Sequence, residues 1–156
     1  TESAVMMDSA GVMSPEPSDM FKMIAEGRNP FLITDRKSFD EFYAMTMEQP
    51  PLLPGVVLAA IADKYQTRRE QLHKIWSDFH SSDYLENDLD KIKAPAMLWW
   101  GDKDRLLHVS AVPLWQAGIP NLKIHIFEGI GHMPMMEVPK QSARIYAEFL
   151  AEVHQQ

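Results

Sequence analysis

The sequence predicts an α/β fold: a small parallel sheet with helices on its faces, and a separate group of helices inserted between two of its strands. A short apolar run occupies Ala4–Met7, helical signals fill residues 18–79, and strand and helix patterns alternate from residue 94 onward. The expected units are a core strand at 1–11, a helical cap or lid with connecting loops at 12–93, and a C-terminal core at 94–156.

The first strand is short and ends at a clear turn signal. Its four apolar residues fit a buried strand, and residues 8–11, Asp-Ser-Ala-Gly, form the turn that ends it. Pro15 and Pro17 follow closely, and two prolines so near each other prevent a regular element. We therefore expect a loop between this strand and the first helix.

The cap begins with signals for three helices. Ser18 is a favourable N-cap for a short helix, and Gly27 is a favourable residue at its end. Residues 38–41, Ser-Phe-Asp-Glu, have the capping-box pattern, which predicts a second helix. Pro54 is well placed to open a third helix that runs toward Tyr65.

A fourth cap helix begins with another capping-box pattern at residues 67–70, Thr-Arg-Arg-Glu. Its apolar residues recur at the spacing i, i+3, i+4 and i+7, which places them on one helix face. These residues are Leu72, Ile75, Trp76 and Phe79. Four helices in succession without a strand are typical of an inserted lid.

The C-terminal core reads as strand, helix, strand, helix. Residues 96–100 form a continuous apolar run stopped by Gly101, as expected for a parallel strand covered on both faces. A helix at 110–117 with Ser110 as its cap and a strand at Lys123–Phe127 follow. The last helix, Pro139–Val153, is expected to turn five residues toward the core: Ala143, Tyr146, Phe149, Leu150 and Val153.

Composition excludes several classes of function. The net charge of −7 argues against nucleic-acid binding and against docking on an anionic membrane. There is no cysteine, which excludes disulfides and thiolate metal sites. No apolar run is long enough to span a bilayer, so we expect no transmembrane segment. We also expect no cofactor and no metal site.

Two polar residues follow the strands of the C-terminal core at the positions where ligands gather in open α/β sheets. Asp104 comes four residues after residues 96–100, and a carboxylate there can hold the tautomer of a histidine. His132 comes five residues after the next strand and can act as a general base. Each alone also fits an ordinary loop, Asp104 as a turn residue that bonds its own backbone.

Other candidates rank lower. Asp8 ends the first strand, where a catalytic acid could also sit, but it fits a turn equally well. Ser9 lacks the glycine two positions upstream that a nucleophile elbow needs, because Met7 stands there. Glu137 precedes the last helix, where a carboxylate favours the positive end of the helix dipole, so its expected role is structural.

Several motifs in order resemble the C-terminal part of α/β-hydrolase-fold enzymes. They are Lys-Ile-Lys-Ala-Pro at 91–95, Gly-Asp-Lys-Asp at 101–104, Gly-His-Met-Pro at 131–134 and Glu-Val-Pro at 137–139. The cap sequence is similar to the lipase and monoacylglycerol-lipase-like branch. The resemblance implies that Asp104 is the triad acid and His132 the base, and that the strands are the sixth to eighth of an eight-stranded sheet.

The sequence departs from this family because it contains no Gly-x-Ser-x-Gly. We therefore expect the C-terminal fragment of a serine hydrolase, a carboxylic-ester hydrolase or lipase, that is inactive alone. Its expected substrate is a small ester or lipid. The open edge along Ala4–Met7 is expected to pair with an N-terminal half or to self-associate, and to leave the isolated chain marginally stable.

Two alternatives remain at this point. The chain could be a non-catalytic binding or interaction module derived from the same fold. It could also belong to an enzyme that hydrolyses C–C bonds, epoxides or haloalkanes, because the nucleophile distinguishes these reactions and is absent here.

Overall fold

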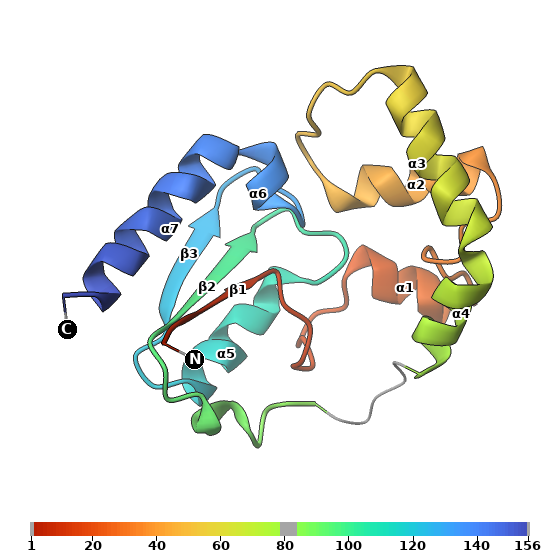
Figure 1. The fold of residues 1–156 in the computed structure, drawn as a ribbon. Coiled ribbons are helices and arrows are strands. Elements are labelled where there is room, and N and C mark those ends of the chain that lie inside the picture. Colours follow the sequence, from red (N-terminus) through yellow and green to blue (C-terminus); the bar gives the residue numbers. More distant parts are fainter. Residues whose placement is uncertain (1, 79–83, 156) are drawn as a thin grey trace.

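A computed structural model describes residues 2–78 and 84–155, and it contains a three-stranded parallel sheet in the order β1-β2-β3 (Figure 1). The strands are β1 (Ala4–Met7), β2 (Ala96–Gly101) and β3 (Lys123–Phe127). In register, Ala4 pairs with Ala96, and Met97 pairs with Lys123. The predicted fold class is confirmed.

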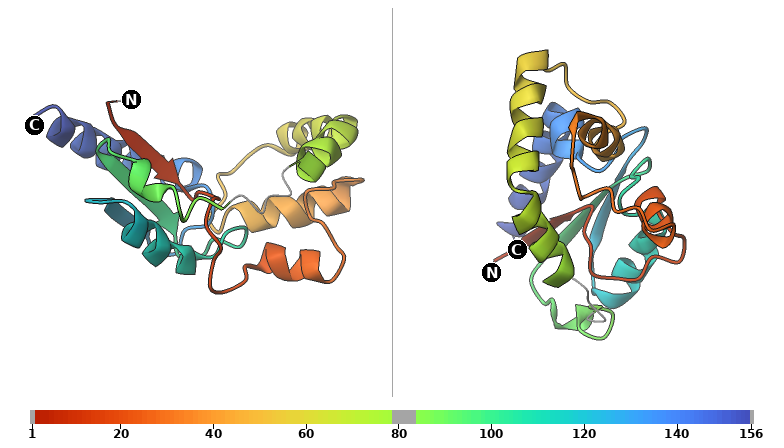
Figure 2. Two further views of the ribbon diagram at one scale, coloured as in Figure 1. Left: turned by 90° about the horizontal axis from the view of Figure 1, so that it is seen from below. Right: turned by 90° about the vertical axis from the view of Figure 1, so that its right-hand side faces the viewer.

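Helices cover the sheet on both faces, with α5 (Val112–Gly118) on one side and α7 (Pro139–Val153) on the other (Figure 2). Successive side chains of β2 alternate between the two faces, as the period of a strand requires. Leu98 and Trp100 belong to the cluster that contains Trp115 of α5, whereas Met97 and Trp99 pack with Phe149 of α7. The continuous apolar run is therefore explained by burial on both faces.

The cap consists of α1 (Asp19–Ala25), α2 (Arg36–Thr46), α3 (Gly55–Thr67) and α4 (Arg69–Asp78). These helices lie to one side of the sheet and form their own core (Figure 1). Its buried members are Met20, Ile33, Phe39, Phe42, Met45, Ala62 and Leu106. Leu106 comes from the loop after β2, so the cap core contacts the sheet where that strand ends.

Both predicted capping boxes are wrong. The N-cap of α2 is Asp35, which accepts the backbone N–H of Ser38, while the Ser38 hydroxyl bonds the backbone of Asp35 in return. The helix therefore begins one turn earlier than expected. Thr67 is the last residue of α3, and its hydroxyl donates to the carbonyl of Lys64 rather than capping α4.

The apolar faces predicted for two helices are less buried in the structure than such faces usually are. No described residue of α4 is buried, and Ile75 is half exposed; Phe79 lies outside the described residues. In α7 the core side consists of Ser142, Ile145 and Phe149. Phe149 is therefore the only fully buried member of the five that were predicted.

Part of the predicted α7 face lines a surface groove instead of the core. Ala143 and Tyr146 flank this groove of about 420 Å³ together with Val5 and Met7 of β1. Trp99 of β2 lines the groove too, so it lies over the face of β1 and β2 that is turned toward α7. No described strand pairs with the edge of β1 that faces away from β2. The apolar residues of α7 thus occupy a wider part of the helix surface than the part that is buried in the core.

Three short helical segments complete the chain: η1 (Leu89–Lys91), η2 (Val109–Ala111) and α6 (Pro134–Glu137). The expected helix at 110–117 begins as the 3₁₀ turn η2, and its N-cap is His108 rather than Ser110. The Ser110 hydroxyl instead bonds the His108 ring, the Ser14 hydroxyl and the Glu16 N–H. None of the described helices is both long and apolar enough to cross a bilayer.

Candidate active site

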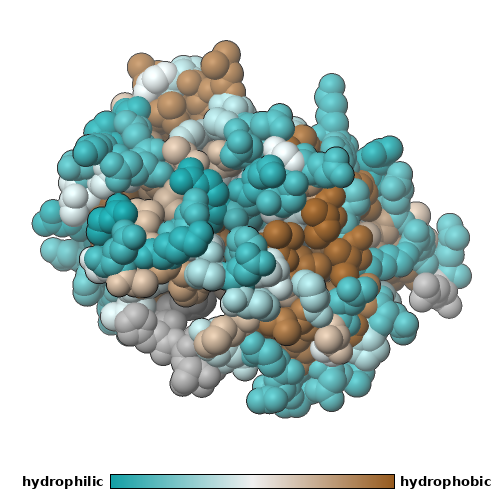
Figure 3. Space-filling view, turned by 180° about the vertical axis from the view of Figure 1, so that it is seen from behind, coloured by the Kyte–Doolittle hydropathy of each residue, from teal (hydrophilic) through white to brown (hydrophobic). Residues whose placement is uncertain are grey.

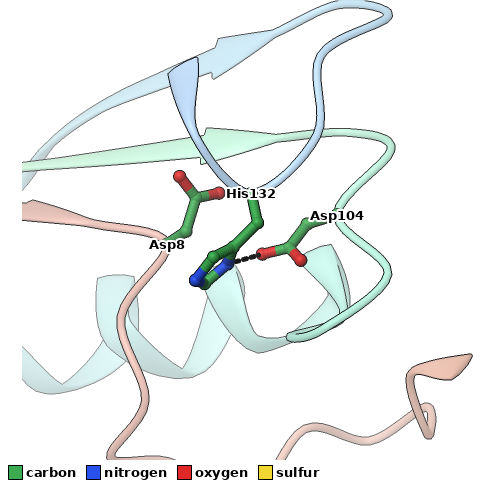
Figure 4. A group of neighbouring side chains, drawn as sticks. All are labelled: Asp8, Asp104 and His132. Carbon is green, nitrogen blue, oxygen red and sulfur yellow. Dashed lines mark hydrogen bonds and ion pairs between the residues drawn. The ribbon is translucent and has the colours of Figure 1, made fainter. Parts of the chain in front are cut away.

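Asp104 and His132 meet beyond the carboxyl ends of β2 and β3, which lie side by side (Figure 4). Nδ1 of His132 lies 2.8 Å from Oδ2 of Asp104. Because a carboxylate can only accept, the ring nitrogen donates in this bond. The second ring nitrogen, Nε2, points away from Asp104. The predicted meeting of the two side chains is therefore present in the structure.

The Asp104 carboxylate is buried and held on both oxygens. Its side chain has no exposed surface, while the His132 side chain is one-quarter exposed. Oδ1 accepts the backbone N–H groups of Leu106 and Leu107 at 2.8 and 3.0 Å. Two backbone donors stabilise the negative charge and leave Oδ2 directed at the ring.

The end of β2 brings the two loops into close contact. An added Cβ on Gly101 would lie 2.0 Å from the carbonyl oxygen of Gly131 and 2.4 Å from that of Ile130. Only glycine permits this approach. The Gly101 carbonyl accepts the Asp104 N–H at 3.1 Å, and Lys103 donates to the Ile130 carbonyl at 2.9 Å. The turn that carries the acid is thus built against the loop that carries the histidine.

Glu137 is a site residue that the sequence analysis treated only as a structural group at a helix start. Its Oε1 accepts the N–H of Gly131 at 2.9 Å, next to His132 in the chain. Its Oε2 accepts the N–H groups of Glu48 and Gln49 at 2.9 and 2.7 Å. One carboxylate therefore joins the histidine loop to the segment that follows α2.

The cap is also bonded directly to both loops. The backbone N–H of His132 donates to the carbonyl of Thr46, the last residue of α2. Arg105 donates to the Asp19 carboxylate of α1 at 2.8 Å, and this bond lowers the pKa of Asp19. These contacts place the ends of α1 and α2 around the acid and the base.

Asp8 is a third titratable group beside the pair. It is 3% exposed, and its Oδ1 accepts the backbone N–H of Gly101 at 2.8 Å. Burial raises the pKa of Asp8 from 3.8 to about 8; the Gly101 N–H opposes the rise, and the charges of Asp104 and Glu137 add to it. Asp104, and not Asp8, is the carboxylate that bonds the His132 ring in the structure.

Among the described residues, one group has side-chain types and a spacing that could suit a metal ion: Asp8, Asp104 and His132. One candidate ligand atom from each of the three lies within 4.8 Å of the other two. Each side chain already has a hydrogen-bond partner: the last two bond each other, and Asp8 accepts from Gly101.

Known proteins similar to this chain are lipases and related hydrolases. Lipase 1 of Psychrobacter immobilis is 30% identical over 146 residues, which cover 92% of this chain and 46% of that protein. Monoacylglycerol lipase ABHD6 of Bos taurus is 29% identical over 128 residues, covering 80% and 38%. The crystal structure of a membrane phospholipase A, described as a bacterial virulence factor, has a TM-score of 0.93 at 29% identity, covering 97% and 49%.

No family model matches the chain, so membership depends on these relatives and on the fold. The chain spans about half the length of the curated relatives it matches first. Their sequences, the parallel sheet and its flanking helices agree with one another. The chain belongs to the α/β-hydrolase superfamily and corresponds to the C-terminal part of that fold.

Proposed function

We propose that this chain supplies the acid and the base of a serine hydrolase that cleaves carboxylic esters, with Asp104 as the acid and His132 as the base. The observation that carries the proposal is the 2.8 Å bond between Oδ2 of Asp104 and Nδ1 of His132. This bond places the ring proton on Nδ1 and leaves Nε2 able to accept a proton.

In the proposed reaction, Nε2 of His132 takes the proton of a serine hydroxyl as the serine oxygen attacks the ester carbonyl. The imidazolium then returns that proton to the departing alkoxide, and the acyl-enzyme is hydrolysed by the same sequence with water as the nucleophile. Asp104 stabilises the imidazolium throughout. The serine and the oxyanion donors are assigned to a segment outside these 156 residues, because no Gly-x-Ser-x-Gly occurs in them. The chain alone is expected to be inactive.

The substrate class is proposed from the relatives and from the cap. The similar proteins are named lipase, monoacylglycerol lipase and phospholipase, which all act on esters of lipids. We assign the cap to residues 12–93 between the core segments 1–11 and 94–156. Apolar side chains are exposed on the cap at Leu52, Val56 and Val57, and the view from behind shows a hydrophobic group at the top of the molecule, where α3 begins (Figure 3).

The nucleophile-bearing half is proposed to pair with the open edge of β1. No described strand pairs with that edge, and Val5 and Met7 of β1 line a surface groove together with Trp99 and Tyr146. Such an edge favours the addition of a further strand. The length of the curated relatives, about twice that of this chain, leaves room for the half that would carry the serine.

A chimera tests the proposal. The N-terminal half of the Psychrobacter immobilis lipase is joined ahead of this chain, and both a p-nitrophenyl ester and a serine-directed fluorophosphonate are applied. We expect labelling of a serine in the added half and ester hydrolysis. Both should be lost in His132→Ala and kept in His73→Ala, an exposed control on the cap.

Two outcomes would contradict the proposal. A folded chimera that hydrolyses no ester would favour the non-catalytic module, and gel filtration with circular dichroism establishes whether it is folded. Labelling of a serine in the unmodified chain would place a nucleophile within the 156 residues and overturn the division of roles.

A further inference from the structure

Asp8 is a buried carboxyl group that the proposed reaction does not use. It follows β1 directly and adopts the left-handed backbone conformation, with a φ of +42°, although it is not glycine. Residues with a side chain rarely adopt this conformation, and it persists only where neighbouring contacts enforce it. Strained residues of this kind cluster at functional sites, so the contacts of Asp8 are informative.

Asp8 extends the pairing of β1 with β2 beyond the last strand residue. Its N–H donates to the Trp99 carbonyl at 3.0 Å, and its Oδ1 accepts the Gly101 N–H at 2.8 Å. Gly101 in turn accepts the Asp104 N–H and packs against the loop that leads to His132. Asp8 therefore holds Gly101, and Gly101 contacts both the loop that carries Asp104 and the loop that carries His132.

The other oxygen of Asp8 faces the pair without a hydrogen-bond partner. Oδ2 is buried, and no N–H or O–H group of the described residues donates to it. One oxygen each from Asp8 and Asp104 and one ring nitrogen of His132 lie within 4.8 Å of one another. In Figure 4, the Asp8 and Asp104 carboxyl groups both lie beside the His132 side chain. An ionised Asp8 would thus place a second negative charge beside that of Asp104 in a buried site, which is unfavourable.

We propose that Asp8 is a positioning residue of the acid–base pair, a neutral carboxyl group that holds Gly101 through Oδ1 and keeps its own proton on Oδ2, so that Asp104 alone carries the negative charge opposite His132. The inference goes beyond the proposed function but depends on it for its catalytic meaning. Loss of the Asp8 proton at alkaline pH adds a charge that favours the imidazolium over the free base, so a smaller share of resting His132 is the free base that can accept the serine proton. The other titratable groups facing Asp8 are Asp104, Glu137 and His132.

The first test is a nuclear magnetic resonance titration of the 156-residue chain. The side-chain ¹³Cγ signal of Asp8, assigned by its loss in Asp8→Asn, should titrate near pH 8. The His132 ring signals should shift with the same midpoint, and this shift should vanish in Asp8→Asn. Asp63→Asn, a change of an exposed aspartate on α3, should leave both curves unchanged. An Asp8 midpoint near 4 would overturn the proposal.

The second test distinguishes a role of Asp8 in positioning the acid–base pair from a role in packing alone. In the active chimera, Asp8→Asn keeps a neutral group that can accept from Gly101, so kcat/KM at pH 7 should stay within about threefold of the parent. Its pH profile should lack the break near pH 8. Asp8→Ala removes the acceptor and should lower kcat/KM by about tenfold or more, chiefly through kcat.

The two proposals fail in different ways. In the first case the chimera is active and loses its activity in His132→Ala. If Asp8→Asn then has the same pH profile as the parent, or the same loss of kcat/KM as Asp8→Ala, only the role of Asp8 is refuted. If the folded chimera is inactive while the titration of Asp8 and its effect on His132 are as expected, the proton assignment stands without its catalytic meaning.

Discussion

Replacing Glu137 by glutamine should weaken the link between the cap and the histidine loop. The carboxylate accepts three backbone N–H groups, from Gly131 on one oxygen and from Glu48 and Gln49 on the other. A glutamine has one carbonyl oxygen, so its NH₂ group must face either Gly131 or the other two donors. At least one of the three backbone N–H groups therefore loses its acceptor oxygen and faces the glutamine NH₂ group, which is itself a donor.

The size of the loss follows from the number of bonds. A hydrogen bond to a charged group contributes roughly 1.5–3 kcal/mol, and partial exposure of the donors favours the lower end. We expect Glu137→Gln to lower the free energy of unfolding by about 2–4 kcal/mol, measured by urea denaturation at pH 7. Glu128→Gln, a change of an exposed residue that follows β3, is the matched control.

The position of His132 gives a second measurement on the same variant. Because Gly131 precedes His132, loss of its acceptor should broaden or shift the His132 ring signals, whereas Glu128→Gln should not. A Glu137→Gln chain that unfolds within about 0.5 kcal/mol of the parent, with unchanged His132 signals, would refute the idea that this carboxylate holds the loop.

Three further perturbations test the same site. Between about pH 4 and pH 8 the folded state keeps the Asp8 proton that the unfolded state releases. As the pH rises through this range, the free energy of unfolding of the parent should therefore fall relative to that of Asp8→Asn by roughly 1.4 kcal/mol per pH unit, on the order of 6 kcal/mol in all. Parallel curves of the free energy of unfolding against pH for the two proteins would contradict this. Gly101→Ala puts a Cβ 2.0 Å from a carbonyl oxygen, and it should lower the free energy of unfolding by about 3 kcal/mol or prevent folding. In the same urea experiment, Gly55→Ala has open space around its Cβ and should leave the free energy of unfolding unchanged or slightly higher. Asp104→Asn should remove the Nδ1–H signal of His132 and lower kcat of the active chimera about 10⁴-fold; a loss below tenfold would argue against Asp104 as the triad acid.

The sheet and the meeting of Asp104 with His132 were accessible from sequence for one physical reason. Parallel strands covered on both faces have continuous apolar runs, and their carboxyl ends lie on one edge of the sheet. Polar residues a few positions after two neighbouring strands are therefore brought together by the topology. No long-range information beyond the strand order is needed for that prediction.

The contacts that hold the pair in place could not be predicted in the same way. Glu137 bonds backbone groups 88 and 89 residues away, and Asp8 bonds a backbone group 93 residues away. Any backbone N–H can serve as such a donor, so the sequence contains no signal for the partner. The helix start at Asp35 failed differently, because Asp35 and Ser38 offer overlapping capping patterns three residues apart and the earlier one forms.

The position of the histidine depends on the cap as well as on the sheet. The N–H of His132 donates to Thr46 at the end of α2, and Glu137 bonds the next residues of that segment together with Gly131. A rigid displacement of α2 would have to break these bonds or carry the histidine loop with it. Movements of the cap that keep His132 against Asp104 are therefore confined to segments beyond Gln49, chiefly α3 and α4. Since α4 buries no described residue, that part of the cap has the least packing to lose on moving.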